Sequence, residues 1–310
     1  MLVLALAPAA GAVAYGSSLY NRDFPDPSVI RVKGVWYAYG TSTAYERPNH
    51  LFPILRSRDL QHWSYAGDAL TKIPSWSDGH WWAPGLLVRN GIIYMYYSAQ
   101  ANGHGDHCLA LAVSRNPLGP FRDIGPISCG DEQTAGYIDP APFIDDDGSG
   151  YLFFAVDGPA HTIGEMPLQG DLFHPAGPVR QLFGVSQPWQ EGLAAETVEG
   201  PSLVEHDGLY YLLYSAGSYS TDYRMGYAVA ASPAGPYIDS PINPILEGGP
   251  LSAPGGGSVF AGIGGRPWLA FNAWSGPLGY GKGGIRTLRI APLFWDGTSI
   301  SVNAPGGSSS

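Results

Sequence analysis

The sequence predicts an all-β fold, a five-bladed β-propeller with four-stranded antiparallel blades. The first reason is a unit of apolar segment, Gly-bearing turn and aromatic strand that occurs five times in 310 residues. A period of this length is typical of propeller blades. The second reason is composition, since 43 Gly, 28 Pro and 13% aromatic residues favour turns and strands. The third is that no long segment carries apolar residues at helical spacing. The spacings between repeat openings are 57, 56, 61 and 56 residues, measured at Pro27, Pro84, Pro140, Pro201 and Gly257.

Each repeat contains one strand that is easily recognised by its β-branched and aromatic residues. These strands are predicted at 35–39, 92–97, 151–154, 209–214 and 267–271. A turn signal precedes each strand and predicts a tight hairpin, at Lys33-Gly34, Asn90-Gly91, Asp147-Gly148, Asp207-Gly208 and Gly264-Gly265. Similar segments mark a third and a fourth strand, at 57–63, 114–121 and 232–237. The agreement between repeats supports a single repeated unit.

The chain is interpreted as one domain, residues 15–302, because the repeat runs without a break in composition. The formal net charge is −10 with only 16 Lys and Arg, which argues against nucleic acid and anionic membranes as partners. Residues 1–14 are predicted to be a secretory signal peptide, with an apolar first strand as the alternative. Residues 303–310 resemble a linker to a further module. The expected location is therefore extracellular.

Cys108 and Cys129 are the only two cysteines, and they flank one predicted hairpin of the second repeat. In an oxidising compartment they are expected to form a disulfide. The alternative is a pair of buried thiols.

Three repeats open with a carboxylate, Asp26, Asp139 or Glu199. Because the opening of each innermost strand faces the axis of a propeller, these residues are expected to meet in one pocket. Like charges that lie close together keep at least one acid protonated near neutral pH. An acid facing an ionised carboxylate is the arrangement needed for glycoside hydrolysis. Each motif alone is more often a turn, and only the recurrence favours catalysis.

The local sequence also suggests how these groups are held. Asp26 lies between two prolines and is predicted to be extended, as suits a general base, and Asp139 has the same Asp-Pro context. Glu199 precedes Gly-Pro, and its longer side chain suits an acid that must reach a glycosidic oxygen. Trp81 and Trp82, expected at the start of the innermost strand of blade two, are candidates for a sugar platform.

The ordered set of these motifs resembles glycoside hydrolase family 43, over nearly the whole chain after the leader. That family consists of five-bladed propellers acting on arabinose- and xylose-containing plant polysaccharides. The segments that carry the resemblance are 21–27, 82–84, 138–140 with 145–148, 199–202 and 286–295. The resemblance implies that Asp26 is the general base, Glu199 the general acid, and Asp139 the carboxylate that orients the acid and raises its pKa. It also implies that Arg286 reaches into the pocket to contact substrate, with a solvated surface arginine as the alternative.

The resemblance implies inversion at the anomeric carbon and no required cofactor or metal. Many family members place a His in the fifth repeat, where it helps hold an axial calcium ion. Here that repeat opens with Pro254-Gly-Gly-Gly257, and the next strand has Asn272-Ala-Trp274 where some members have His. An axial calcium ion is therefore in doubt. Gly85 also replaces the polar residue that is frequent after Trp-Ala-Pro.

The expected function is a secreted, inverting exo-glycosidase that removes terminal α-L-arabinofuranosyl units from arabinan or arabinoxylan. β-Xylosidase is the alternative within the same mechanism. A sugar-binding propeller without activity is the alternative outside it, because folds do not imply function. A third alternative is the retaining fructan-cleaving clan, whose Asn-Asp-Pro-Asn-Gly setting differs from Phe24-Pro-Asp26-Pro-Ser here.

Overall fold

The computed structural model describes residues 16–43, 50–103, 105–130, 135–158, 161–193 and 197–304. The predicted signal peptide, 1–14, and most of the predicted tail, 303–310, lie outside these ranges. In the described ranges nearly all regular structure is β-strand, so the predicted all-β class is confirmed. None of the helices described there has the length and apolar character needed to cross a membrane.

The strands follow one another in five groups of four, each antiparallel and in sequential order. The first group is β1 (Ser28–Val32), β2 (Val35–Tyr39), β3 (Pro53–Ser57) and β4 (Ser64–Asp68). The second is β5 (Ser77–Arg89), β6 (Ile92–Ala101), β7 (His107–Ser114) and β8 (Arg122–Cys129). The third is β9 (Gly136–Ile144), β10 (Gly150–Asp157), β11 (Thr162–Leu168) and β12 (Arg180–Phe183). The fourth is β13 (Val198–His206), β14 (Leu209–Ala216), β15 (Arg224–Ala230) and β16 (Ile238–Asp239). The fifth is β17 (Ser252–Ala261), β18 (Pro267–Ser275), β19 (Ile285–Asp296) and β20 (Ser299–Val302).

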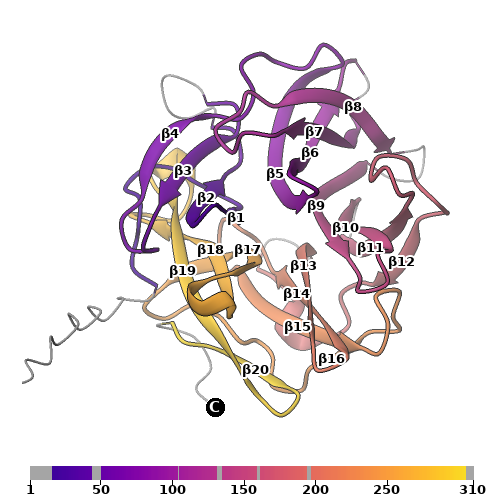
Figure 1. The fold of residues 1–310 in the computed structure, drawn as a ribbon. Coiled ribbons are helices and arrows are strands. Elements are labelled where there is room, and N and C mark those ends of the chain that lie inside the picture. The colour runs from indigo at the N-terminus through magenta and orange to yellow at the C-terminus, as the bar shows by residue number, and fades with distance from the viewer. Residues whose placement is uncertain are drawn as a thin grey trace, which may run out of the picture.

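These groups surround a common centre, with β1, β5, β9, β13 and β17 on the inside and the fourth strands outside (Figure 1). The second and third groups join into one eight-stranded sheet through a single parallel pair between His107 and Gly136. Three short 3-10 helices complete the regular structure of the described ranges, η1 (Pro188–Gln190), η2 (Ile263–Gly265) and η3 (Tyr280–Lys282).

Apolar side chains fill the spaces between neighbouring groups. On β6, Met95 and Tyr97 pack toward the first group while Tyr96 packs toward the third, as the two faces of a strand require. Four such clusters join consecutive groups, and a fifth joins the first group to the last through residues such as Trp36 and Trp268. The ring is therefore closed by side-chain packing of the same kind that holds its neighbours together.

Backbone hydrogen bonds add to this closure. The segment before β1 runs along β19, where Leu19 N–H donates to Leu288 O at 3.0 Å and Phe24 N–H donates to Arg286 O at 2.7 Å. This contact brings the N-terminal carboxylates beside an arginine more than 250 residues later in the chain. The closure of the ring thus also builds part of the axial site.

The aromatic strands predicted from the sequence are all present, as β2, β6, β10, β14 and β18. The turns before them were predicted less well. Three are two-residue turns with both residues at positive φ, at 33–34, 90–91 and 207–208, as tight hairpins require. The turns at 145–149 and 262–266 are longer loops, so the prediction of tight hairpins was wrong there. The Asp-Gly and Gly-Gly pairs supply turn residues but do not by themselves determine loop length.

Candidate active site

A cavity of about 570 Å³ opens on the axis of the ring. Its walls come from all five strand groups and from the loops at one end of them. The predicted residues Asp26, Asp139, Glu199 and Arg286 all line it. The three carboxylates that the sequence places far apart are therefore brought into one space.

Backbone conformation shows how the strand openings correspond. At a corresponding position of each opening the backbone has positive φ, a conformation that residues with a Cβ rarely adopt. The five φ values are 51°, 47°, 58°, 59° and 58°, at Asp26, Ala83, Asp139, Gly200 and Gly256. Asp26 and Asp139 occupy equivalent positions, whereas the equivalent position in the fourth repeat is Gly200, and Glu199 precedes it by one residue. The three carboxylates are thus not strictly equivalent, contrary to the sequence interpretation.

The positive φ values of Asp26 and Asp139 also show that the prediction of an extended backbone at these two residues was wrong. The rule for residues before proline describes only local sterics. Here tertiary hydrogen bonds hold the backbone, since Asp26 N–H donates to Asn272 Oδ1 at 2.8 Å and Asp139 N–H donates to Ser98 Oγ at 3.0 Å. A strained conformation held by its surroundings is common at functional sites.

Asp26 lies on the side of the cavity where the first and fifth groups meet. Thr41 Oγ1–H donates to its Oδ2 at 2.7 Å, and Arg286 Nη1–H donates to its Oδ1 at 3.0 Å. The Arg286 side chain is 11% exposed, so it belongs to the pocket and is not the solvated surface residue of the alternative. Asp26 therefore faces a buried, permanently charged cation.

Arg286 is itself held by several groups. Its Nε–H donates to Tyr280 Oη at 2.8 Å, its backbone N–H donates to Asp23 Oδ1 at 2.8 Å, and its guanidinium lies 5.0 Å from the ring centre of Tyr219. Burial by itself lowers the pKa of Arg286, but Asp26, Tyr280 and Asp23 together outweigh it and hold that pKa above its ordinary value. Burial also raises the pKa of Asp23 to about 6, although Arg286 opposes this shift.

Glu199 lies on the opposite side, where the third and fourth groups meet. Tyr223 Oη–H donates to Glu199 Oε1 at 2.7 Å, and His161 Nδ1 lies 3.1 Å from Glu199 Oε2. Burial raises the pKa of Tyr223 well above its ordinary value, so this hydroxyl remains a donor. Both oxygens of Glu199 are thus held in fixed positions.

Asp139 lies between these two sides. It accepts a hydrogen bond from Gly200 N–H at 2.9 Å, directly beside Glu199. Burial raises the pKa of Asp139 well above its ordinary value, and the negative charges of Glu199 and Asp26 raise it further. The carboxylate paired with Arg286 thus faces two further carboxyl groups across the cavity, one of which has a raised pKa. Acid–base hydrolysis of a glycoside requires an acid opposite a base in this way.

Comparison with known proteins agrees with this geometry. The family model for glycosyl hydrolases family 43 matches residues 15–299. This chain belongs to glycosyl hydrolase family 43.

Relatives of this family 43 chain include enzymes with different activities. It is 28% identical to extracellular endo-alpha-(1->5)-L-arabinanase 1 of Bacillus subtilis, over 86% of the chain and 82% of that protein. It is 25% identical to extracellular exo-alpha-(1->5)-L-arabinofuranosidase ArbA of Cellvibrio japonicus, over 89% of the chain and 84% of that protein. Among solved structures, a thermostable family-43 glycoside hydrolase matches with a TM-score of 0.85 and 30% identity, covering 96% of this chain and 97% of that one.

The two predicted platform residues of the family 43 chain both line the cavity. They lie inside β5, which begins at Ser77, so the prediction that they start this strand was wrong. The ring of Trp82 stacks on His80, with centroids 4.4 Å apart and an interplanar angle of 12°. Trp81 also packs against the core between the first two groups. Cys108 and Cys129 form a disulfide that joins β7 to β8.

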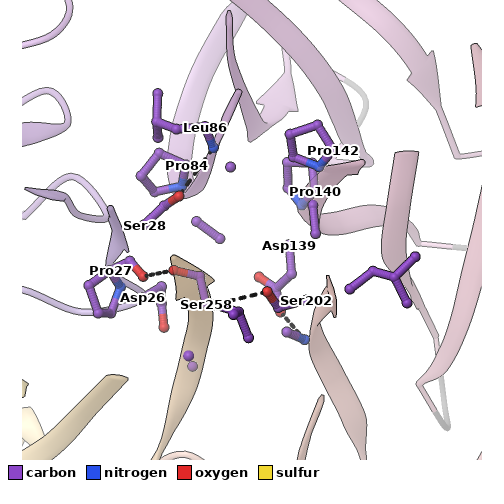
Figure 2. A pocket seen from close by; sticks show the side chains of 18 residues that line it. Asp26, Pro27, Ser28, Pro84, Leu86, Asp139, Pro140, Pro142, Ser202 and Ser258 are labelled. Carbon is purple, nitrogen blue, oxygen red and sulfur yellow. Dashed lines mark hydrogen bonds between the residues drawn. The ribbon is translucent and has the colours of Figure 1, made fainter. Parts of the chain in front are cut away.

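A smaller pocket of about 100 Å³ is lined by residues of β1, β5, β9, β13 and β17 and shares Asp26 and Asp139 with the cavity (Figure 2). Eight of its 18 lining residues are proline or glycine, and Ser28, Ser202 and Ser258 add hydroxyls. In the described part of the chain no group of three His, Cys, Asp or Glu is arranged to hold a metal ion. Calcium takes roughly six to eight oxygen ligands, so this donor set does not fit it. We therefore derive no step through a metal ion.

Several residues around the carboxylates were not predicted from the sequence. They are Asp23, Thr41, Asp157, His161, Tyr223 and Tyr280. Asp23 lies within the 21–27 motif and could have been found there, because it is a second carboxylate three residues before Asp26. His161 and Tyr223 come from loops between strands, where no period marks a position.

Proposed function

We propose that this protein is a secreted, inverting exo-glycosidase that removes terminal α-L-arabinofuranosyl residues from arabinan or arabinoxylan. The observation that carries the proposal is the meeting of Asp26, Asp139 and Glu199 in one cavity. The fold proposed with it is a five-bladed propeller, in which the eight-stranded sheet counts as two blades. The arabinanase of Bacillus subtilis and the arabinofuranosidase of Cellvibrio japonicus, both extracellular, support the proposed sugar and an extracellular site of action.

In the proposed reaction Asp26 is the general base and Glu199 the general acid. Glu199 gives its proton to the leaving oxygen while the bond between that oxygen and the anomeric carbon breaks. A water molecule gives its hydroxyl to the anomeric carbon from the opposite face and its proton to Asp26. Arg286 and Thr41 support Asp26 in this role, since both bond to its carboxylate.

Asp139 has the supporting role in this scheme. Its bond to Gly200 N–H places it directly beside the acid, and its negative charge favours the protonated form of Glu199. The cavity walls supply aromatic surface from Trp81 and Trp82, which suits the apolar face of a sugar ring.

A side-by-side assay with the nitrophenyl α-L-arabinofuranoside and the nitrophenyl β-D-xyloside tests the proposed substrate. We expect turnover of the arabinofuranoside to dominate. Turnover of the xyloside alone would favour the β-xylosidase alternative. A protein that binds pentose oligosaccharides but hydrolyses none of them would be a binding propeller, and the enzyme proposal would be wrong.

A further inference from the structure

A hydrogen-bonded row of four residues leads away from Glu199, and we call it the histidine–aspartate chain. Its members are His161, Asp157, His107 and His80. His161 Nε2 lies 2.9 Å from Asp157 Oδ1, His107 Nδ1 lies 3.0 Å from Asp157 Oδ2, and His80 Nδ1 lies 3.0 Å from His107 Nε2. With the contact of 3.1 Å between His161 Nδ1 and Glu199 Oε2, the row is continuous from the acid to the Trp82 platform.

The direction of each hydrogen bond follows from Asp157, because an ionised carboxylate only accepts. His161 must donate from Nε2, and His107 must donate from Nδ1. In a neutral His107 whose Nδ1 is protonated, Nε2 accepts from His80 Nδ1–H. Burial lowers the pKa of His80, so His80 is neutral and its Nε2 is a hydrogen-bond acceptor. This end of the chain lines the cavity.

The backbone holds the chain where the second and third strand groups join. His107 N–H donates to Ala135 O at 2.9 Å, and Ala135 N–H donates to Asp157 O at 3.0 Å. Gly136, at φ 117°, allows this approach because a Cβ there would lie only 2.1 Å from His107 O. Asp157 is therefore presented to both histidines by a rigid part of the fold.

The charges around His161 favour its protonated form. Asp157 and Glu199 bond to its two nitrogens, and the Asp139 carboxyl also interacts with it electrostatically. Burial by itself lowers the pKa of His161, but the bonds to Asp157 and Glu199 outweigh it and raise that pKa to about 10. At neutral pH an imidazolium thus donates to both carboxylates.

We propose that Asp157 and His161 are positioning residues for the acid step, and that Asp157, acting through His161, sets the upper pH limit at which Glu199 can deliver a proton. This inference rests on the proposed function, because it assigns the acid role to Glu199. It adds that the cation beside Glu199 is His161, which can lose its proton, and that a second carboxylate, Asp157, keeps His161 charged. The two neighbours have opposite effects on the proton that Glu199 gives to the leaving group. The negative charge of Asp139 favours its retention on Glu199, whereas the positive charge of His161 favours its release.

The sign of the effect can be stated for each substitution. Asp157→Asn removes the partner that keeps His161 charged, so His161 becomes neutral at a lower pH. Loss of that nearby positive charge favours the protonated acid, and the basic limb of the kcat/KM profile moves to higher pH. We expect a movement of about one pH unit. His161→Gln removes the charge outright and moves the limb further.

The experiment compares pH profiles of the wild type, Asp157→Asn, His161→Gln and the matched control Asp171→Asn. Asp171 also accepts from a histidine, His174, at 2.6 Å, but this pair is exposed and not part of the cavity. An upward movement in the first two variants and none in the control supports the inference. A lower kcat with an unmoved basic limb would mean that the chain is only a structural brace, and the inference would be overturned.

Titrations followed by nuclear magnetic resonance distinguish failure of this inference from failure of the proposed function. In the folded proteins, ¹⁵N chemical shifts report the protonation state of His161, and ¹³C carboxyl chemical shifts report the protonation states of Asp139 and Glu199. We expect the His161 midpoint to fall and the carboxyl midpoint to rise in Asp157→Asn, whether or not a substrate is turned over. Unchanged midpoints overturn the inference even if the wild type is an active arabinofuranosidase. Changed midpoints in an inactive wild type would instead reject the proposed function alone.

Discussion

The two sides of the cavity hold their carboxylates in different ways. Asp26 bonds to Arg286, a cation that does not lose its proton in the working range of an enzyme. Glu199 bonds to His161, a cation that can titrate, and lies beside Asp139, a carboxyl group whose pKa is raised by burial. A group that must stay ionised thus has a permanent counter-charge. A group that must gain and lose a proton in each cycle has neighbours that can share it.

The largest expected effect comes from the Arg286 side. Asp26→Asn keeps the shape of the residue but removes the base that activates water. We expect kcat to fall by about 10²- to 10⁴-fold, measured on the arabinofuranoside. Asp207→Asn is the matched control, because Asp207 also has a φ of 51° but is exposed in a turn. Equal losses in both variants would indicate that backbone strain, and not the base, is responsible.

Glu199→Gln tests the opposite side and should depend on the leaving group. Nitrophenolate departs without much help from an acid, whereas a sugar alkoxide needs a proton. We therefore expect a loss of about 10²- to 10⁴-fold on arabino-oligosaccharides and a much smaller one on the nitrophenyl glycoside. Oligosaccharide binding, measured by calorimetry, should be retained. Equal losses on both substrates would contradict the acid role.

Arg286→Gln sharpens the contrast between the two cations. Removal of a permanent charge beside Asp26 should move the acid limb of the kcat/KM profile to higher pH, by about one unit, and leave the basic limb in place. His161→Gln should do the reverse and move only the basic limb. Movement of the same limb in both variants would mean that the two sides are not specialised as described.

The smallest expected effect concerns stability. The folded state binds the His161 proton more tightly than an unfolded chain, since the pKa is about 10 instead of 6.5. This stabilisation is complete below about pH 6.5 and is lost as the pH rises toward 10, with a total on the order of a few kcal/mol. Thermal denaturation at several pH values should therefore show a larger decline for the wild type than for His161→Gln. Parallel declines would show that His161 is not charged in the folded state.

The two sides of the cavity also differ in how well their residues could be predicted from the sequence. The strands and the three carboxylates follow a period that strand geometry imposes, and Arg286 came from the family resemblance. On the Glu199 side, only Glu199 and Asp139 were predicted. His161 and Tyr223 lie on loops, and Asp157 ends a strand, so no repeat identifies them as partners of the acid.

Two predictions about the strand openings were wrong. Asp26 was predicted to be extended from its two neighbouring prolines, but Asn272, which lies 246 residues away, fixes its backbone. Glu199 was treated as equivalent to Asp26 and Asp139, but the residue that precedes the proline in this repeat, and that has positive φ, is Gly200. Local rules describe a residue and its neighbours, whereas these positions are set by contacts across the ring.

The most direct test of the account is the configuration of the sugar at the moment it is released. Proton nuclear magnetic resonance during the first minutes of hydrolysis of an α-L-arabinofuranoside follows this before the anomers interconvert. A water molecule activated by Asp26 on the face opposite to Glu199 predicts β-L-arabinofuranose as the first product. First appearance of the α anomer would mean that Asp26 attacks the sugar itself, and the division of roles between the two sides would be wrong.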